Sequence, residues 1–378
     1  MKTELFYRKL ERTACRLRSA VGAWKPAMAF AVLALYLLPL GAQEFRYGVD
    51  MVSFFDNREY GADFQKSQTL IGVRLSPEIG LEIADENGGN HRIMAGVHAL
   101  QPFGATFGEC QLSPTAYYSY GKDGFSMHLG AVPYVKLYED LPSNLMYDST
   151  ALYHPNLLGG LFQYRNGRWQ AEFLCDWFSQ KNGERHEAFR LIGQGRYHGR
   201  LWFAGARFQM NHLASNGLQR TGACDDLVLH PYVGLDFTGH IPVDSLSFHL
   251  GWIQEYEWPR HYWDSPALPG GLMLNVEARW KFLGLSENLY VGDNLFPCYV
   301  PEGKSQRLNQ GDPFYQSECY SRTDLFAYLV RTPFVSCLFS WNLHYTREYG
   351  LDHQQQLIVR FSTDGIGQKA KLRNLYNK

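Results

Sequence analysis

Residues 168–178 read Arg-Trp-Gln-Ala-Glu-Phe-Leu-Cys-Asp-Trp-Phe, and this run alternates between two unlike faces. One face carries Trp169 and Trp177, while the other carries Glu172 and Asp176. Strict period-two alternation predicts a β-strand whose two faces meet different environments. The same pattern recurs through most of the chain, and helical spacing is not sustained outside the N-terminal region. The sequence therefore predicts an all-β protein.

Sixteen alternating runs can be counted, and together they predict the strands of one sheet. The runs at 286–294 and 324–331 are short and alternate poorly, so the expected count is about 16 within a range of 14–18. The predicted strands are 45–55, 68–84, 91–101, 111–120, 125–135, 156–165, 168–178, 187–197, 200–211, 226–238, 246–256, 271–281, 286–294, 324–331, 334–346 and 353–361.

The gaps between these runs alternate between short turns and long loops. The short gaps lie near 86–90, 121–124, 166–167, 198–199, 239–245, 282–285 and 332–333. The long gaps lie near 56–67, 102–110, 136–155, 179–186, 212–225, 257–270, 295–323 and 347–352. A membrane barrel has tight turns on one rim and long loops on the other. The sequence thus predicts a transmembrane antiparallel up-and-down β-barrel with both termini on the short-turn, periplasmic side.

The character of the two faces separates this barrel from a secreted β-sandwich. The apolar faces end on aromatic residues such as Trp169, Trp280 and Tyr345, as expected of interfacial girdles. The polar faces combine arginine and carboxylates with glycine, serine and glutamine, which suits a hydrated lumen. A sandwich would instead bury an aliphatic face and expose a mixed one.

The N-terminus predicts export across a membrane. Residues 1–27 carry seven basic and two acidic side chains, and an apolar run of 13 residues follows at 28–40. That run is too short for a spanning helix, which needs roughly 20 residues. Small residues follow it, so we interpret 1–42 as a signal peptide. We expect the barrel to occupy 43–361 and a basic, disordered periplasmic tail to occupy 362–378.

Composition excludes several classes of function. Removing the basic signal leaves a chain more acidic than the formal net charge of −1 of the whole, which argues against a nucleic-acid partner. No Cys-x-x-Cys pair occurs, so no structural metal site is expected, and nothing indicates a cofactor. Cys298 and Cys319 lie in one predicted loop, where an oxidising compartment allows a disulfide, although free thiols fit equally well.

The last predicted strand ends on Phe361, in phase with Val359 and Leu357, as closing strands of outer-membrane barrels typically do. Together with the Ala42-Gln43 junction and the segment Phe54-Phe55-Asp56-Asn57-Arg58-Glu59-Tyr60, it makes the chain resemble the uncharacterised porin-like barrels of the Bacteroidetes group. The resemblance implies a bacterial outer-membrane location, lipid contacts and insertion by the barrel-assembly machinery. The tail after Phe361 departs from the usual terminal folding signal.

The polar faces supply candidate pore-lining residues, and neighbouring acids and bases such as Asp176 and Arg190 are expected to lie close enough to pair. Such charges either create a transverse field across an open pore or stiffen and plug the lumen. Sixteen strands usually leave an aqueous channel. The candidates are Arg74, Glu78, Glu82, Arg92, Glu172, Asp176, Arg190, Arg196, Arg207, Asp236, Glu277, Arg279 and Arg360.

Two long loops carry further candidates. The third long loop, 136–155, contains Glu139, Asp140 and Asp148, which would constrict a channel if the loop folds inward as in general porins and would be solvated if it lies on the surface. Loop 257–270 places Trp258, Tyr262 and Trp263 either as a stacking platform for sugar rings or as part of the outer aromatic girdle.

Enzyme motifs are absent from the sequence. No His-Glu-x-x-His or Gly-x-Ser-x-Gly string occurs, so we predict a non-enzyme while leaving a hydrolase at the barrel rim open. The primary hypothesis is a porin-like channel for passive diffusion of small polar solutes, saccharides among them. The alternative is a non-conducting barrel that binds a partner protein or surface glycan through its extracellular loops. The sequence indicates no oligomeric state.

Overall fold

The structure is a computed structural model, and it describes residues 43–182, 186–214, 223–260, 263–298 and 309–363. Sixteen antiparallel strands close into one barrel in which each strand pairs with its sequence neighbours and β1 pairs with β16. Their bounds are β1 Gln43–Glu59, β2 Gln68–Ala84, β3 Asn90–Pro102, β4 Gln111–Lys122, β5 Phe125–Pro133, β6 Asn156–Arg165, β7 Trp169–Ser179, β8 Ala188–His198, β9 Trp202–Leu213, β10 Cys224–Asp236, β11 Ser245–Pro259, β12 Gly270–Trp280, β13 Leu283–Gly292, β14 Cys319–Arg331, β15 Val335–Thr346 and β16 Gly350–Ser362.

The predicted barrel is confirmed, strand for strand. The largest disagreement concerns β14, which begins at Cys319 although the alternation predicts a start at 324. The extra residues include Ser321 and Thr323, whose hydroxyls donate to Glu287 of β13. Both faces of this segment carry polar residues, so it lacks the alternation of apolar and polar side chains from which strands are predicted. The predicted signal peptide and most of the predicted tail lie outside the described residues.

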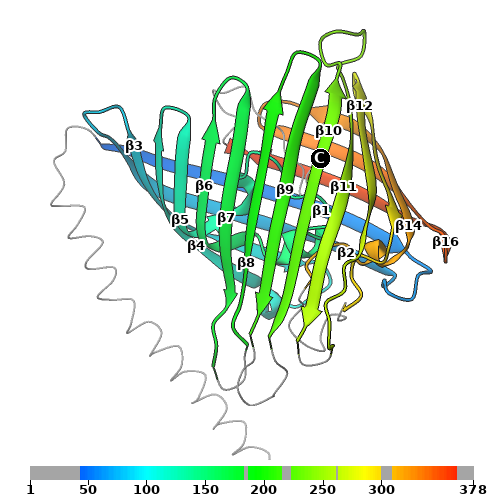
Figure 1. The fold of residues 1–378 in the computed structure, drawn as a ribbon. Coiled ribbons are helices and arrows are strands. Elements are labelled where there is room, and N and C mark those ends of the chain that lie inside the picture. Colours follow the sequence, from blue (N-terminus) through cyan, green and yellow to red (C-terminus); the bar gives the residue numbers. More distant parts are fainter. Residues whose placement is uncertain (1–42, 183–185, 215–222, 261–262, 299–308, 364–378) are drawn as a thin grey trace, which may run out of the picture. The chain divides into compact units, whose positions relative to one another are not determined.

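Turns and loops occupy opposite rims of the barrel. In Figure 1 the front strands β6 to β11 are joined by tight turns at the upper rim and by long loops at the lower rim. The β4–β5 hairpin shows why the turns can be tight: Asp123 and Gly124 both have positive φ, 49° and 84°. This conformation matches the right-handed twist of the strands and favours Asp-Gly.

Three short helical segments lie in the long-loop connections near the site described below. They are η2 Tyr134–Lys136 and α2 Asp148–Tyr153 between β5 and β6, and η3 Pro313–Gln316 between β13 and β14. None of the helices among the described residues has the length and apolar character needed to cross a membrane.

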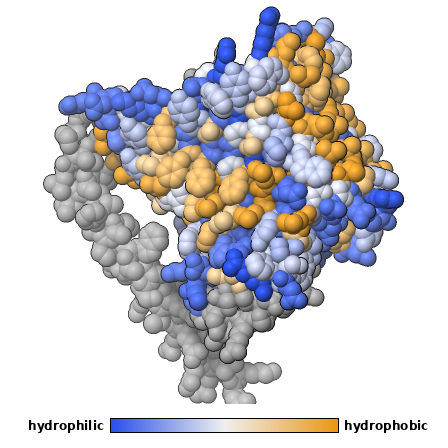
Figure 2. Space-filling model, in the orientation of Figure 1, coloured by the Kyte–Doolittle hydropathy of each residue, from blue (hydrophilic) through white to orange (hydrophobic). Residues whose placement is uncertain are grey.

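The outer wall of the barrel is apolar. Large side chains with more than a third of their surface exposed include Phe55, Phe173, Leu250 and Leu357, all at outward positions of their strands. Figure 2 shows hydrophobic residues across the middle of the visible wall, with hydrophilic residues gathered above and below them. Such a belt on a closed sheet, which has no unpaired edge strand, suits a lipid environment.

Candidate functional site

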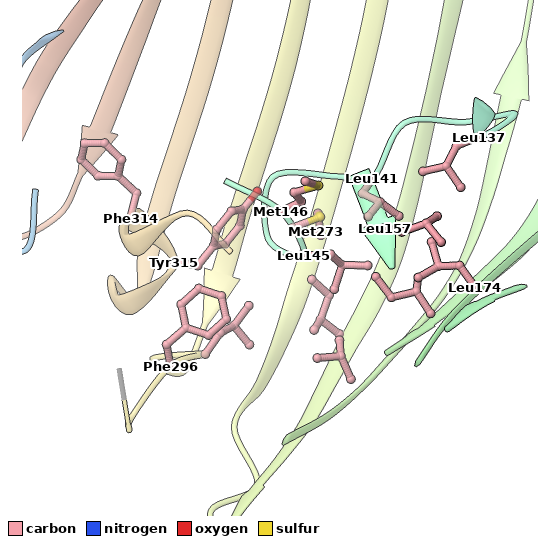
Figure 3. Close-up of a cluster of buried hydrophobic side chains, with 14 of the residues drawn as sticks. Leu137, Leu141, Leu145, Met146, Leu157, Leu174, Met273, Phe296, Phe314 and Tyr315 are labelled. Carbon is pink, nitrogen blue, oxygen red and sulfur yellow. The ribbon is translucent and has the colours of Figure 1, made fainter. Parts of the chain in front are cut away.

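The lumen of the barrel is filled by a loop rather than by water alone. Residues 134–155, here called the inserted loop, fold inward and bury Leu137, Leu141 and Leu145 against the wall. Figure 3 shows these leucines beside Leu157 and Leu174 from the strands. The sequence left open whether this loop folds inward or lies on the surface, and in the structure it folds inward.

Glu172 of β7 fastens the inserted loop to the wall. Its carboxylate accepts the backbone amides of Tyr138 at 2.8 Å and Glu139 at 3.0 Å. The side-chain amides of Gln163 and Gln194, on the strands flanking β7, donate to the same carboxylate. Glu172 is nearly fully buried, so these four donors replace the water that the charge has lost.

A second fastening joins Asp176 of β7 to Arg190 of β8. The two side chains form a buried ion pair with 3.4 Å between Nε and Oδ2. The hydroxyl of Tyr134, at the start of the inserted loop, donates to Asp176 at 2.5 Å, and the guanidinium of Arg190 donates to Tyr134. Asp176 also accepts the amide of Leu158, so one carboxylate orients both ends of the loop.

The far end of the inserted loop is fastened to β14 by a cluster of charges. Arg322 pairs with Asp148 of the loop at 3.0 Å, with Asp324 at 3.1 Å and with Asp312 at 3.9 Å. Burial raises the pKa of Asp312 to about 6, while Arg322 opposes the shift. Arg322 thus holds three carboxylates together in this part of the lumen, although the buried Oδ2 of Asp312 makes no hydrogen bond to any described residue.

Every predicted pore-lining residue occupies an inward position. These residues differ in what they contact: the inserted loop, other residues of the wall, or a cavity. Glu172, Asp176, Arg190 and Arg196 bind the inserted loop, the last through Glu139 at 3.0 Å. Wall-to-wall contacts use Glu82 with Arg92, Arg360 with Asp50, and Glu78 with Tyr117, whereas Asp236 accepts from a turn amide. Arg207, Glu277 and Arg279 line a cavity, and Arg74 lies near a smaller one. A pore-lining role for these residues stays a prediction.

The loop candidates are only partly brought together. Glu139 and Asp148 are held in the ion pairs above, and Asp140 lines the same cavity as Arg207. Trp258 lies at the end of β11 that leads into a long loop. Its indole donates to the backbone carbonyl of Trp263, and the guanidinium of Arg260 lies over its ring. Tyr262 lies outside the described residues.

The disulfide that the sequence allowed between Cys298 and Cys319 is not formed in the structure, where both are free thiols. Their backbones lead to different strands: the amide of Cys298 donates to Glu257 of β11, whereas Cys319 pairs with Val291 of β13. Of the two alternatives that the sequence left open, a disulfide or free thiols, the structure contains free thiols.

A polar cluster interrupts the apolar outer wall where β1, β2 and β16 approach the long-loop rim. We call this set the outer cluster; it comprises Asn57, Glu59, Thr69, His353 and Gln355. Asn57 faces Gln355 and Glu59 faces His353 across the β1–β16 pair. Their neighbours on the outer face, Phe55 and Leu357, are exposed and apolar. Ionisable side chains on a lipid-facing wall are costly and indicate function.

Hydrogen bonds link all five members of the outer cluster. His353 Nε2 lies 3.3 Å from a Glu59 oxygen, and its Nδ1 lies 2.9 Å from the Gln355 amide nitrogen. The amide of Asn57 donates to Glu59 at 2.9 Å and to Gln355 at 2.8 Å, while the Thr69 hydroxyl donates to the Asn57 oxygen at 2.8 Å. Glu59 and His353 remain substantially exposed, with 57% and 40% of their side-chain surface accessible.

This arrangement has the parts that ester hydrolysis needs. A carboxylate beside imidazole Nε2 favours the tautomer with the proton on that nitrogen, which leaves Nδ1 as the basic nitrogen. The Nδ1 lone pair accepts a hydrogen bond from the Gln355 amide, so water must displace that amide before Nδ1 can take its proton. The Asn57 amide and the Thr69 hydroxyl lie beside that base, and they can stabilise a developing oxyanion when a substrate oxygen replaces their present acceptors. Among the described residues, no group of three or more histidine, cysteine or carboxylate side chains is arranged to hold a metal ion.

Sequence reasoning missed this cluster because it searched the polar faces of the strands. Asn57 and Glu59 share the outward phase of Phe55, and His353 and Gln355 share that of Leu351 and Leu357. Polar residues inside an apolar phase were the available signal. They occur at strand ends, where alternation is weakest, and only the closed register brings residues about 300 positions apart together.

Comparison with known proteins gives a family. The family model described as "Lipid A 3'-O-deacylase-type" matches residues 37–364, which is most of the chain. No curated protein matches the sequence significantly.

Solved structures support the fold. A triple mutant of the porin from Rhodopseudomonas blastica superposes with a TM-score of 0.50 at 11% sequence identity, covering 84% of this chain and all of the porin. Another mutant of that porin gives the same TM-score, identity and coverage. The likeness concerns the fold, which is that of an outer-membrane barrel.

Proposed function

The chain belongs to the Lipid A 3'-O-deacylase-type family, and from that premise we propose that it hydrolyses an acyl ester of a lipid A-like glycolipid at its outer wall. The observation that carries the proposal is the His353–Glu59 pair, hydrogen-bonded through Asn57 and Gln355 and placed on the lipid-facing surface. A substrate anchored in the membrane can reach this surface without entering the barrel.

The reaction assigns a task to each member of the outer cluster. His353 Nδ1 accepts a proton from water, whose oxygen attacks the ester carbonyl carbon, and Glu59 stabilises the imidazolium that forms. Once the substrate displaces their present acceptors within the cluster, the amide of Asn57 and the hydroxyl of Thr69 stabilise the oxyanion. The bond between the former carbonyl carbon and the sugar oxygen then breaks, the proton passes to the departing sugar alkoxide, and a fatty acid and a free sugar hydroxyl result.

The test is mass spectrometry of lipid A incubated with the detergent-refolded barrel. We expect a mass loss of one acyl chain with the wild type and little or none with Glu59→Gln. The matched control is Asp85→Asn, because Asp85 pairs with His91 at 3.1 Å at the opposite rim. Intact lipid A after incubation with a correctly folded wild type contradicts the proposal, as does equal loss of activity in both variants.

The solute channel predicted from the sequence remains a second candidate. A lumenal cavity of about 410 Å³, lined by Arg196, Arg207, Glu277 and Arg279, favours it. The buried leucines of the inserted loop count against a wide pore. Single-channel recording separates the two: discrete current steps support conduction, and a silent bilayer that contains folded barrel contradicts it. A silent bilayer is also the result expected if the barrel does not conduct and instead binds a partner protein or surface glycan through its extracellular loops. For the channel and for this alternative, we propose that both termini lie in the periplasm.

A further inference from the structure

The lumenal cavity carries charges that the inserted loop does not use. It is lined at the turn end of the barrel by Ser245 at the start of β11, Arg279 near the end of β12 and Leu285 near the start of β13. The inserted loop contributes further lining residues between Tyr138 and Ala151. The cavity of about 410 Å³ falls within the usual range for sites that hold small molecules, roughly 300–1,000 Å³.

Arg207 is the most unusual group in this cavity. Its side chain is buried to more than nine-tenths and its guanidinium lies 4.6 Å from the ring centroid of Tyr232. Its Nε has no hydrogen-bond acceptor, and among the described residues no carboxylate forms an ion pair with it. A buried guanidinium without an anion is costly, because its lost hydration is not replaced.

Other donors without partners surround the same space. Nε of Arg279 and Nε2 of His249 are buried and make no hydrogen bond, although both residues line the cavity. Asn275, Asn288 and Ser247 add neutral polar groups to this wall.

Most of the acids that face the cavity form ion pairs with arginines other than Arg207 and Arg279. Glu139 is paired with Arg196, and Asp148 and Asp324 are paired with Arg322. Asp140 and Glu277 are the remaining acids of the lining. Among the described residues, Arg207 and Arg279 are therefore the two arginines of this lining that form no ion pair.

We infer that this cavity is a binding site for a small oxyanion, a phosphate or carboxylate carried by a hydroxylated molecule about the size of a monosaccharide. Arg207 and Arg279 bind the anion, His249 donates through Nε2, and the asparagine and serine side chains bind hydroxyl groups. Guanidinium groups suit such anions because they donate parallel hydrogen bonds. The inference is independent of the outer cluster and of any deacylase activity.

Calorimetric titration of the refolded full-length barrel tests it, with inorganic phosphate, glucose 6-phosphate and glucose as probes at fixed ionic strength. We expect glucose 6-phosphate to bind more tightly than phosphate, and glucose to bind at least about tenfold more weakly than either. Arg207→Gln is expected to weaken binding of both anions about tenfold or more.

The matched control is Arg168→Gln, because Arg168 lies in an exposed turn at the same end of the barrel and its loss changes the net charge equally. Anion binding that is unchanged in Arg207→Gln, or reduced equally in Arg168→Gln, overturns the inference. If Arg207→Gln does not give the heat-modifiable gel band of a folded barrel, Arg279→Gln provides the same comparison from the half-buried side of the cavity.

Discussion

The lumen and the outer wall use the same residue types under opposite conditions. In the lumen, Glu172, Asp176 and Arg190 are buried, and their hydrogen bonds hold a loop in place. On the outer wall, Glu59 and His353 are partly exposed and pair with each other, and their remaining partners are the neutral side chains of Asn57 and Gln355, which a substrate can displace. This difference shows what each observation can tell about a charged residue in a barrel. Its position in the alternation of a strand tells whether it faces the lumen or the lipid, whereas its partners and its exposure indicate its role.

Replacing His353 with alanine should cause the largest change, a loss of activity from the outer wall. The variant loses the group that accepts the water proton, so kcat for acyl release is expected to fall about 10²- to 10⁴-fold with little change in KM. Added imidazole should restore part of the rate. His91→Ala is the control at the other rim; a rate reduced as much in His91→Ala as in His353→Ala would remove the distinction between the sites.

Arg190→Met should affect stability instead of activity. The substitution leaves Asp176 buried without its charge partner, which costs about 3–5 kcal/mol of unfolding free energy. Urea unfolding of the detergent-refolded barrel measures this cost, with Arg168→Met in the exposed turn as the control. An unfolding free energy within about 1 kcal/mol of wild type contradicts the fastening role of the pair.

Leu145→Ala tests the apolar part of the plug. Leu145 is 1% exposed within the lumenal cluster, so its truncation should cost about 3 kcal/mol and leave a cavity. Limited proteolysis should then cut the inserted loop faster, while acyl release keeps its wild-type rate. A loop that remains as resistant as in the wild type shows that its packing is not held by this side chain.

The smallest effect concerns pH. Burial raises the pKa of Asp312 to about 6, so the folded protein binds more protons than the unfolded chain between its ordinary value of 3.8 and about pH 6. Unfolding free energy contributed by this group is therefore highest below pH 4 and falls by about 2 kcal/mol as the pH rises to 6. Asp312→Asn should remove that slope, and an identical pH profile in the variant contradicts the assignment.

The sequence predicted much of the fold because alternation and gap length are local signals. Strands such as 68–84 and 156–165 match the structure to the residue. The inward fold of the inserted loop could not be decided from the sequence. Leu137, Leu141 and Leu145 recur every four residues in a segment that forms no helix, and they acquire their packing partners from other elements of the barrel. The outer cluster could not be assembled, because β16 joins β1 only when the barrel closes.

The most direct test of the central claim compares one variant from each region on the same lipid. The rate of acyl release from lipid A is measured for Asn57→Leu on the outer wall and for Glu172→Gln in the lumen, both first shown to be folded by heat-modifiable migration. The account predicts that Asn57→Leu loses activity by about 10²-fold while Glu172→Gln retains the wild-type rate. Full activity in Asn57→Leu, combined with loss in Glu172→Gln, would place the chemistry in the lumen and contradict the account.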